Sequence, residues 1–263
     1  MDTLQLVILA LIQGITEFLP ISSSGHLILP SELLGWQDQG LAFDVAVHVG
    51  SLIAVVGYFR NDIINLITAW FSSFSGGATS DSRLAWFVIW ATVPAGLAGL
   101  IFHDFIEQHL RTIAVIAGAT MVFGVFLGLA DWKGARVVSL RAMTLRQALL
   151  IGCAQALALI PGTSRSGITI TAGLAMGLER QAAARFSFLL SIPLITLSGG
   201  FKALDLLGQA SVAWGDIFVG VAVAAVSAAL CIHWFLKWID KIGMWPFVVY
   251  RLLLGGWLLT FAF

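Results

Sequence analysis

The sequence predicts an all-α polytopic membrane protein with an inverted-topology repeat, and three observations support this fold class. Hydrophobic residues make up 59% of the chain and charged residues 11%, with a mean hydropathy of +0.95, whereas typical soluble domains are about 25% charged. Several apolar runs approach the roughly 20 residues that a helix needs to cross a bilayer. A polar, Ser/Gly-rich phrase occurs in the first half of the chain and again in the second.

The repeated phrase runs from Gln13 to His26 and returns from Gln155 to Gly167. The pairs that match at the spacing from Gln13 to Gln155 are Ser22 with Ser164, Ser24 with Ser166, Gly25 with Gly167, and Gly35 with Gly177. We therefore expect a single membrane domain over residues 1–263, with repeat halves at about 1–131 and 146–263. In membrane proteins with internal repeats, the site lies where the repeats meet.

Six apolar runs are expected to cross the bilayer. They lie near residues 41–59, 84–102, 112–130, 184–201, 214–236 and 244–263. The first 35 residues and the stretch from about 146 to 178 each hold two apolar segments that are too short to cross, separated by a Pro/Ser/Gly break. We expect each to be a re-entrant helix pair whose tip is buried, because irregular backbone is tolerated at membrane depth only inside protein or beside water.

Each half then contains one re-entrant pair and three crossings, and this odd number inverts one half relative to the other. The basic residues expected on one side are Arg60, Arg83, Lys133, Arg136, Arg141, Arg146, Arg180, Lys237 and Lys241, against chiefly Arg111 and Lys202 on the other. Cytoplasmic loops accumulate Lys and Arg. We therefore expect both termini on the non-cytoplasmic side of a bacterial plasma membrane, and the tips to meet near its midplane. Residues 72–82 are expected to form a flexible polar loop.

Other classes of site receive little support. The formal net charge of +0 gives no reason to expect a nucleic acid partner. Cys153 and Cys231 lie in apolar runs without CxxC or Cys/His spacing, so we expect neither a disulfide framework nor a zinc site.

The two polar tips each precede a short helix, which places backbone N–H groups and hydroxyls where the helix dipole favours an anion. Two such helix ends converging at one place would form a phosphate cradle. The residues assigned to it are Gln13, Ser22, Ser24, Gly25, Ser164, Ser166, Gly167 and Thr169. The alternative is that the serines and glycines are ordinary helix caps, and that Thr169 bonds back to its own helix.

Ionisable residues favour the functional interpretation. Arg165 lies in a broken membrane segment, where a guanidinium marks a functional site or a paired charge, and its planar fork suits a phosphate. Glu17 lies one helical turn after Gln13 and can hold a divalent metal or act as a base. The alternative is an ion pair between Glu17 and Arg165 with no chemical role.

Two histidines also have candidate roles. His26 follows Ser23 by three residues, a spacing that permits a hydroxyl nucleophile with an imidazole beside it to move the proton. Packing or a structural hydrogen bond is the alternative for His26. Asp44 and His48 lie one turn apart on the third expected helix, where they either line the cavity, bind metal, or stabilise the helix.

Together these motifs resemble the paired signature of bacterial undecaprenyl-pyrophosphate phosphatases of the bacitracin-resistance type. The matching stretches are Gln13-x-x-x-Glu17-Phe18-Leu19-Pro20-x-Ser22-Ser23-Ser24-Gly25-His26 and Pro161-Gly162-x-Ser164-Arg165-Ser166-Gly167. The resemblance extends over essentially the whole chain. It implies an inverted repeat with re-entrant helices, and hydrolysis of the lipid carrier's pyrophosphate to the monophosphate and inorganic phosphate, which recycles the carrier for cell-wall synthesis.

The resemblance also implies roles for individual residues. The positions that match the family's main functional residues are Glu17, Ser23, His26 and Arg165, and those that match supporting residues are Ser22, Ser164 and Thr169. Gln13 stands where many members have a second glutamate, which removes one possible metal ligand. The expected mechanism holds the diphosphate with Arg165, the helix N-termini and a divalent cation, Mg²⁺ or Ca²⁺, near Glu17. Ser23 or a water attacks, and His26 handles the proton.

The alternative from another class is a lipid-phosphate transporter or flippase, because secondary transporters also use inverted repeats with broken helices at the midplane. The polyprenyl pyrophosphate and the membrane are the expected partners in either case, and the sequence leaves a homodimer open. Glu17, Ser23 and His26 all lie in one half of the chain. This asymmetry favours an enzyme, since a carrier has less need of it.

Overall fold

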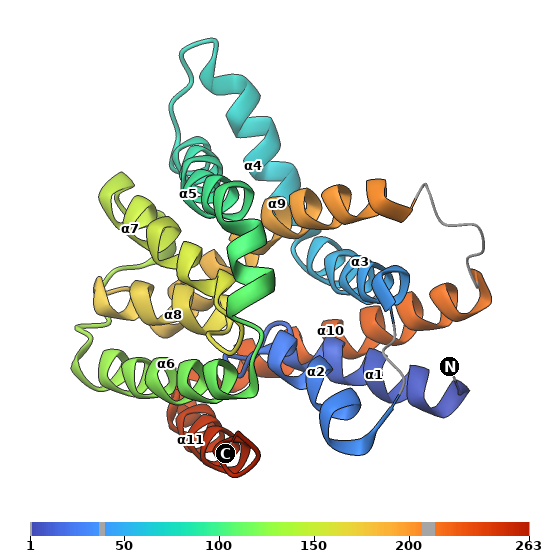
Figure 1. Cartoon of the computed structure of the whole chain (residues 1–263). Coiled ribbons are helices and arrows are strands. Elements are labelled where there is room, and N and C mark those ends of the chain that lie inside the picture. The colour runs from blue at the N-terminus through green and yellow to red at the C-terminus, as the bar shows by residue number, and fades with distance from the viewer. Residues whose placement is uncertain (1, 37–39, 207–213, 263) are drawn as a thin grey trace.

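Helices form nearly all of the described chain, which confirms the predicted all-α class. The computed structural model describes residues 2–36, 40–206 and 214–262, and within these ranges it contains no β-strand, only an isolated bridge between Val138 and Leu178. In chain order the helices are α1 (Thr3–Thr16), α2 (Ser23–Leu34), α3 (Gly40–Tyr58), α4 (Arg60–Ser73), α5 (Ser80–His109), α6 (Ile113–Lys133), α7 (Leu145–Ala156), α8 (Arg165–Ala175), α9 (Arg180–Leu206), α10 (Trp214–Ile242) and α11 (Trp245–Leu259), with short 3₁₀ helices η1 (Leu140–Ala142) and η2 (Leu157–Leu159) (Figure 1).

Five of the described helices are long and apolar enough to span a membrane, namely α3, α5, α6, α9 and α10. They correspond to five of the six predicted crossings. The sixth prediction, over 244–263, is wrong in extent, because α11 has 15 residues and so reaches only about 22 Å. Gly243, with φ 65°, and Pro246 in the first turn define its start, and Thr260 caps its end.

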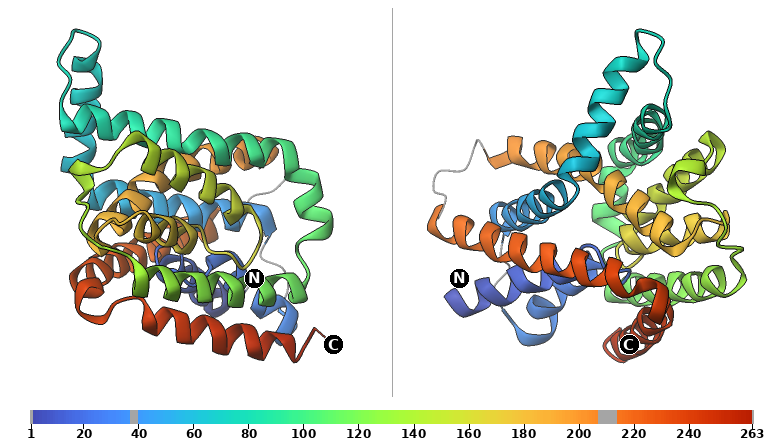
Figure 2. Two further views of the ribbon diagram at one scale, coloured as in Figure 1. Left: turned by 90° about the vertical axis from the view of Figure 1, so that its left-hand side faces the viewer. Right: turned by 180° about the vertical axis from the view of Figure 1, so that it is seen from behind.

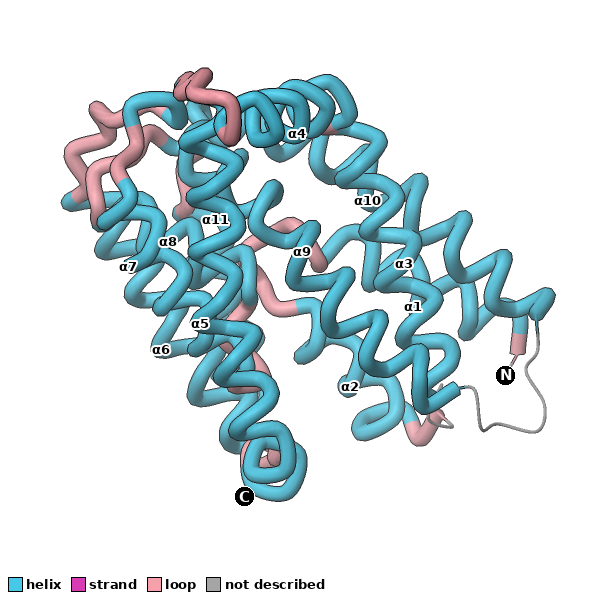
Figure 3. The backbone as a smooth tube through the Cα atoms, turned by 90° about the horizontal axis from the view of Figure 1, so that it is seen from above, coloured by secondary structure: helices cyan, strands magenta, loops and turns pink. Residues whose placement is uncertain are grey.

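The four helices before and after the polar breaks are short, as predicted. The first loop (residues 17–22) joins α1 to α2, and the second loop (residues 160–164) joins η2 to α8. The first loop touches the helix that follows the second loop, because the hydroxyl of Ser166, in the first turn of α8, donates to the carbonyl oxygen of Leu19 at 2.8 Å. In Figure 3, loop segments lie in the middle of the helical bundle as well as at its ends. The prediction that the tips meet inside the protein is therefore confirmed.

Helices of the two halves pack in an exchanged pattern. α1 packs on α10, whereas α7 packs on α5; likewise α3 packs on α10 and α9 packs on α5. Small residues permit the close crossings: a Cβ at Gly14 would lie 2.6 Å from the carbonyl oxygen of Ala224, and one at Gly50 would lie 2.9 Å from the Cβ of the same residue. Each half thus builds its core partly from the other half.

Helix α4 was not predicted. It has no buried residue and exposes Ile64, Ile67 and Phe71, and it projects from the bundle across the direction of α5 (Figure 2, left). The predicted flexible loop 72–82 is correspondingly shorter, because α4 continues to Ser73 and α5 begins at Ser80 behind a capping box formed by Thr79 and Ser82.

The helix ends that carry the basic residues lie together at one end of the bundle. Arg180 donates to both carboxylate oxygens of Asp131 at 2.6 and 2.9 Å and to the carbonyl oxygen of Asp240 at 3.3 Å. Arg141 pairs with Asp81 at 3.4 Å. The contacts of Arg180 join the ends of α6, α9 and α10, and the contact of Arg141 joins η1 to the start of α5.

Asp131→Ala is expected to destabilise the fold without impairing the chemistry. Asp131 is 2% exposed and also accepts the backbone N–H of Met244 at 3.1 Å, so its loss leaves the partly exposed Arg180 guanidinium without its carboxylate and a buried N–H without an acceptor. We expect a loss of about 2–4 kcal/mol of folding free energy, seen as a lower melting temperature in detergent. The exposed Asp216, replaced by Ala, is the control. An unchanged melting temperature for Asp131→Ala would show that this contact is dispensable.

Candidate functional site

The matched serines of the two halves adopt nearly the same unusual backbone conformation. Ser22 has φ 76° and Ser164 has φ 71°, a region that residues other than glycine rarely occupy. Both are N-caps whose side chains accept a backbone N–H, from Gly25 at 3.4 Å and from Gly167 at 3.1 Å. Such strain persists only where the surroundings fix it, and it concentrates at functional sites. The sequence repeat is thus also a repeat in local geometry.

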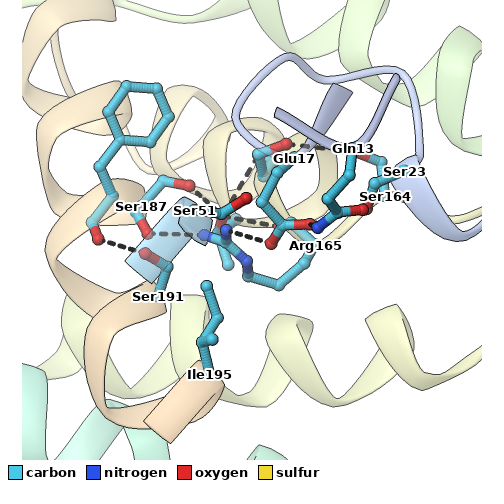
Figure 4. Close-up of polar contacts among 12 residues, drawn as sticks. Gln13, Glu17, Ser23, Ser51, Ser164, Arg165, Ser187, Ser191 and Ile195 are labelled. Carbon is cyan, nitrogen blue, oxygen red and sulfur yellow. Dashed lines mark hydrogen bonds and ion pairs between the residues drawn. The ribbon is translucent and has the colours of Figure 1, made fainter. Parts of the chain in front are cut away.

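Glu17 lies at the centre of the site and accepts three hydrogen bonds (Figure 4). Gln13 Nε2 donates to Oε2 at 3.0 Å, the Ser23 hydroxyl donates to the same oxygen at 2.7 Å, and Arg165 donates to Oε1 at 3.0 Å. The side chains of Glu17 and Arg165 are only 7% and 11% exposed. Four residues singled out in the sequence are therefore joined into one cluster, and the bond from Arg165 connects the second half to the first.

Arg165 is fixed by elements of both halves. A second guanidinium nitrogen donates to the carbonyl oxygen of Ser187 on α9 at 3.0 Å, and the guanidinium carbon lies 5.8 Å from the ring centre of Phe18. The Thr169 hydroxyl donates back to the Arg165 carbonyl oxygen at 2.8 Å, the alternative left open for it, and it also lies 2.7 Å from the Ser187 hydroxyl. Thr169 thus contacts both the backbone of Arg165 and the side chain of Ser187, whose carbonyl oxygen accepts from Arg165.

Of the other residues assigned to the cradle, Ser166 connects the two halves, whereas the glycines bond within their own motifs. Ser166 lies 3.2 Å from the Ser164 hydroxyl as well as donating to the first loop. Gly25 and Gly167 supply the first-turn N–H groups that the serine caps accept. The side chain of Ser24 falls outside what the structure describes.

His26 makes contacts other than the predicted one with Ser23. Its Nδ1 lies 2.7 Å from the Ser22 carbonyl oxygen, which can only accept, so Nδ1 is the donor. Its Nε2 then accepts the Tyr250 hydroxyl at 2.5 Å, and the two rings stack with centres 5.6 Å apart. The proton of Ser23 points instead to Glu17. A proton-transfer role for His26 stays a prediction.

On α3, His48 contacts the backbone of Asp44. His48 Nδ1 donates to the backbone carbonyl oxygen of Asp44 at 2.7 Å, a bond within one helix. Within the ranges that the structure describes, no group of three or more His, Cys, Asp or Glu side chains could hold a metal ion. The side-chain oxygen of Gln13 is buried beside Glu17 without a hydrogen-bond partner. This oxygen is therefore free to act as a ligand to a cation.

Three residues of the site come from helices to which no role was assigned. They are Ser187 on α9, and Tyr250 and Arg251 on α11. A serine or tyrosine in an apolar run carries no signal. Arg251 had one, since an arginine inside a membrane segment marks a functional residue, and the structure places its guanidinium against both loops.

Comparison with known proteins places the chain in a family. The family model described as bacitracin resistance protein BacA matches residues 6–257. The chain is 64% identical over 256 residues to a protein of Saccharophagus degradans and 64% identical over 257 residues to one of Teredinibacter turnerae, in each case covering 97% of both chains. A protein of Hahella chejuensis is 59% identical over 266 residues, covering 100% of this chain and 99% of its own. All three are named undecaprenyl-diphosphatase. The chain therefore belongs to the family of the bacitracin resistance protein BacA.

Proposed function

We propose that this membrane protein hydrolyses undecaprenyl pyrophosphate to undecaprenyl phosphate and inorganic phosphate, which recycles the lipid carrier for cell-wall synthesis. The observation that carries the proposal is the cluster in which Glu17 accepts hydrogen bonds both from Ser23 of its own half and from Arg165 of the other half. A hydroxyl, a carboxylate that accepts its proton, and a guanidinium are the parts that a phosphoryl transfer needs. The printed names of the relatives agree with this activity.

Substrate binding would use the positive ends of the two short helices. The N-termini of α2 and α8 carry the cap serines and first-turn N–H groups, which favour an anion. Arg165 now pairs with a single oxygen of Glu17. A diphosphate would draw the guanidinium fork away from that oxygen, because a phosphate offers two oxygens in matching geometry.

The reaction we propose takes place at the terminal phosphorus. Glu17 accepts the Ser23 proton along the 2.7 Å hydrogen bond while the Ser23 oxygen attacks. The bridging P–O bond breaks, undecaprenyl phosphate leaves, and a phosphoserine remains. Water then attacks this phosphoserine, inorganic phosphate leaves, and Ser23 takes back a proton. In the alternative, Ser23 and Glu17 position a water that attacks directly. We propose that His26, which is held by Ser22 and Tyr250, also takes part in proton transfer during this reaction.

A divalent cation, Mg²⁺ or Ca²⁺, is proposed beside Glu17. The residues present fit such an ion, since Glu17, the unpartnered Gln13 oxygen and Ser23 are all oxygen donors, which these cations prefer. One carboxylate is enough where substrate phosphates complete the ligand set. When bound, the ion would neutralise charge on the phosphates.

For the membrane arrangement we propose an inverted repeat, with halves at about 1–131 and 146–263 and both termini on the non-cytoplasmic side of the plasma membrane. The exchanged packing of α1 and α7 on α10 and α5 supports the repeat, as do the matched conformations of Ser22 and Ser164. The clustering of basic helix ends on one side supports the orientation. The homodimer left open by the sequence stays a prediction.

The test is phosphate release from undecaprenyl pyrophosphate by the purified protein in detergent, with and without a chelator. We expect release that the chelator abolishes, and a fall of about 10²-fold or more in Ser23→Ala, because that variant lacks the nucleophile and its proton transfer. Ser227→Ala, which removes a hydroxyl bonded within α10, is the matched control. Phosphoserine trapped at Ser23 would establish the covalent route. Lipid binding without phosphate release would favour the transporter instead.

A further inference from the structure

We propose that Arg251 is a positioning residue, which holds the two loops at the spacing that the reaction requires. This inference rests on the proposed function, because its consequence is measured as turnover. Arg251 lies on α11, outside both repeated motifs. It is 0% exposed and is the largest fully buried side chain among the described residues.

The guanidinium of Arg251 donates to carbonyl oxygens from three separate elements. One terminal nitrogen donates to Pro20 of the first loop at 3.1 Å. The other donates to Gly162 and Thr163 of the second loop at 3.0 and 2.9 Å. Nε donates to Thr120 on α6 at 2.9 Å. A single rigid, planar group therefore connects the first loop to the second.

These acceptors lie immediately before the reacting residues. Pro20 is three residues before Ser23, and Thr163 is two before Arg165. A change in the distance between the two loops would change the distance from the Ser23 oxygen to a phosphate held by Arg165. Misplacement by about 1 Å can cost on the order of 10²-fold in rate. The contacts of Arg251 with Pro20, Gly162 and Thr163, which we call the clamp, therefore have a direct catalytic consequence.

Carbonyl oxygens accept every hydrogen bond that Arg251 makes to the described residues, so their dipoles face its positive charge. Among the described residues no carboxylate pairs with it, whereas Arg165, Arg180 and Arg185 each have one. Burying a charge without a counter-ion costs folding free energy, and an apolar side chain of similar volume at the same place would avoid that cost. The location of the Arg251 charge gives a reason to keep it. A Cβ at Gly167 would lie 2.8 Å from a terminal nitrogen of Arg251, so the charge lies against the first turn of α8, beside the proposed phosphates.

The preceding residue of α11 serves the same site. Tyr250 donates to His26 in the first half, while Arg251 contacts both loops. Gly124 on α6 leaves room for the arginine, since a Cβ there would lie 3.1 Å from the Cβ of Arg251 and 3.4 Å from its Nε. Arg251 can therefore be displaced by a change that touches neither loop.

The experiment compares Arg251→Lys with Gly124→Ala, which pushes the arginine aside but retains it, and with the control Arg180→Lys at the basic end of the bundle. We measure kcat and KM for undecaprenyl pyrophosphate, and hydrogen–deuterium exchange in residues 17–22 and 160–164. Lysine cannot reach the carbonyls of both loops with one ammonium. We expect kcat to fall about 100-fold in Arg251→Lys and about 10-fold in Gly124→Ala, with KM within about threefold. Exchange should quicken in both loops together, and Arg180→Lys should change neither.

Unchanged exchange in both loops would overturn the clamp, even if kcat fell. Faster exchange with kcat retained would overturn the catalytic need for it. Because exchange is measured without substrate, it tests the clamp independently of phosphate release. Failure of the wild-type protein to release phosphate would count against the proposed function alone.

Discussion

Arg165→Ala is expected to reduce turnover of undecaprenyl pyrophosphate by about 10³-fold or more, which is the usual effect of losing an arginine that stabilises a phosphoryl transition state. The structure gives the reason. Arg165 is the first residue of α8, and Glu17, the Ser187 carbonyl and the ring of Phe18 hold its guanidinium at this helix N-terminus. Charge neutralisation and positioning account for most of the catalysis in this chemistry.

Two further variants make this expectation specific. Arg165→Lys keeps the charge but loses the fork that binds two oxygens, so its turnover should lie between those of the wild type and Arg165→Ala. Arg185→Ala is the matched control, because Arg185 also forms an ion pair, with Asp62 at 2.8 Å, and also lies over an aromatic ring, that of Phe59. Near-normal kcat in purified Arg165→Ala would rule out the proposed role.

Glu17→Gln should impair both activity and stability. The variant cannot accept the Ser23 proton, and loss of a general base lowers turnover by about 10²–10⁴-fold. It also leaves the buried Arg165 without its counter-charge, at a cost of about 3–5 kcal/mol. We expect phosphate release near background and a lower melting temperature. The exposed Glu179 on the second half, changed to Gln, is the control for both measurements.

The sequence predicted those parts of the fold that depend on continuous apolar runs. α3, α5, α6, α9 and α10 were each found because their apolar residues extend over a membrane's thickness. Helix α4 was missed because Asn61, Asp62 and Asn65 interrupt its apolar residues, so that no run forms. The length of α11 depends on the turns at its two ends rather than on hydropathy.

The local parts of the site could also be predicted. Gln13 and Glu17 share a helix face by spacing alone, and the sequence repeat located both loops. The partner of Ser23 could not be chosen, since both His26 and Glu17 were close in sequence and only the fold brings the carboxylate to the hydroxyl. Ser187 and Tyr250 come from distant helices and had no distinguishing pattern.

Whether the contact between Glu17 and Arg165 is catalytic or only structural can be decided by removing both charges at once. In the double variant Glu17→Gln with Arg165→Met, no unpaired buried charge remains, so the melting temperature should recover most of what Glu17→Gln alone loses. Phosphate release should nevertheless stay at least as low as in either single variant. Recovery of turnover along with stability would contradict this, and would reduce the pair to a structural ion pair.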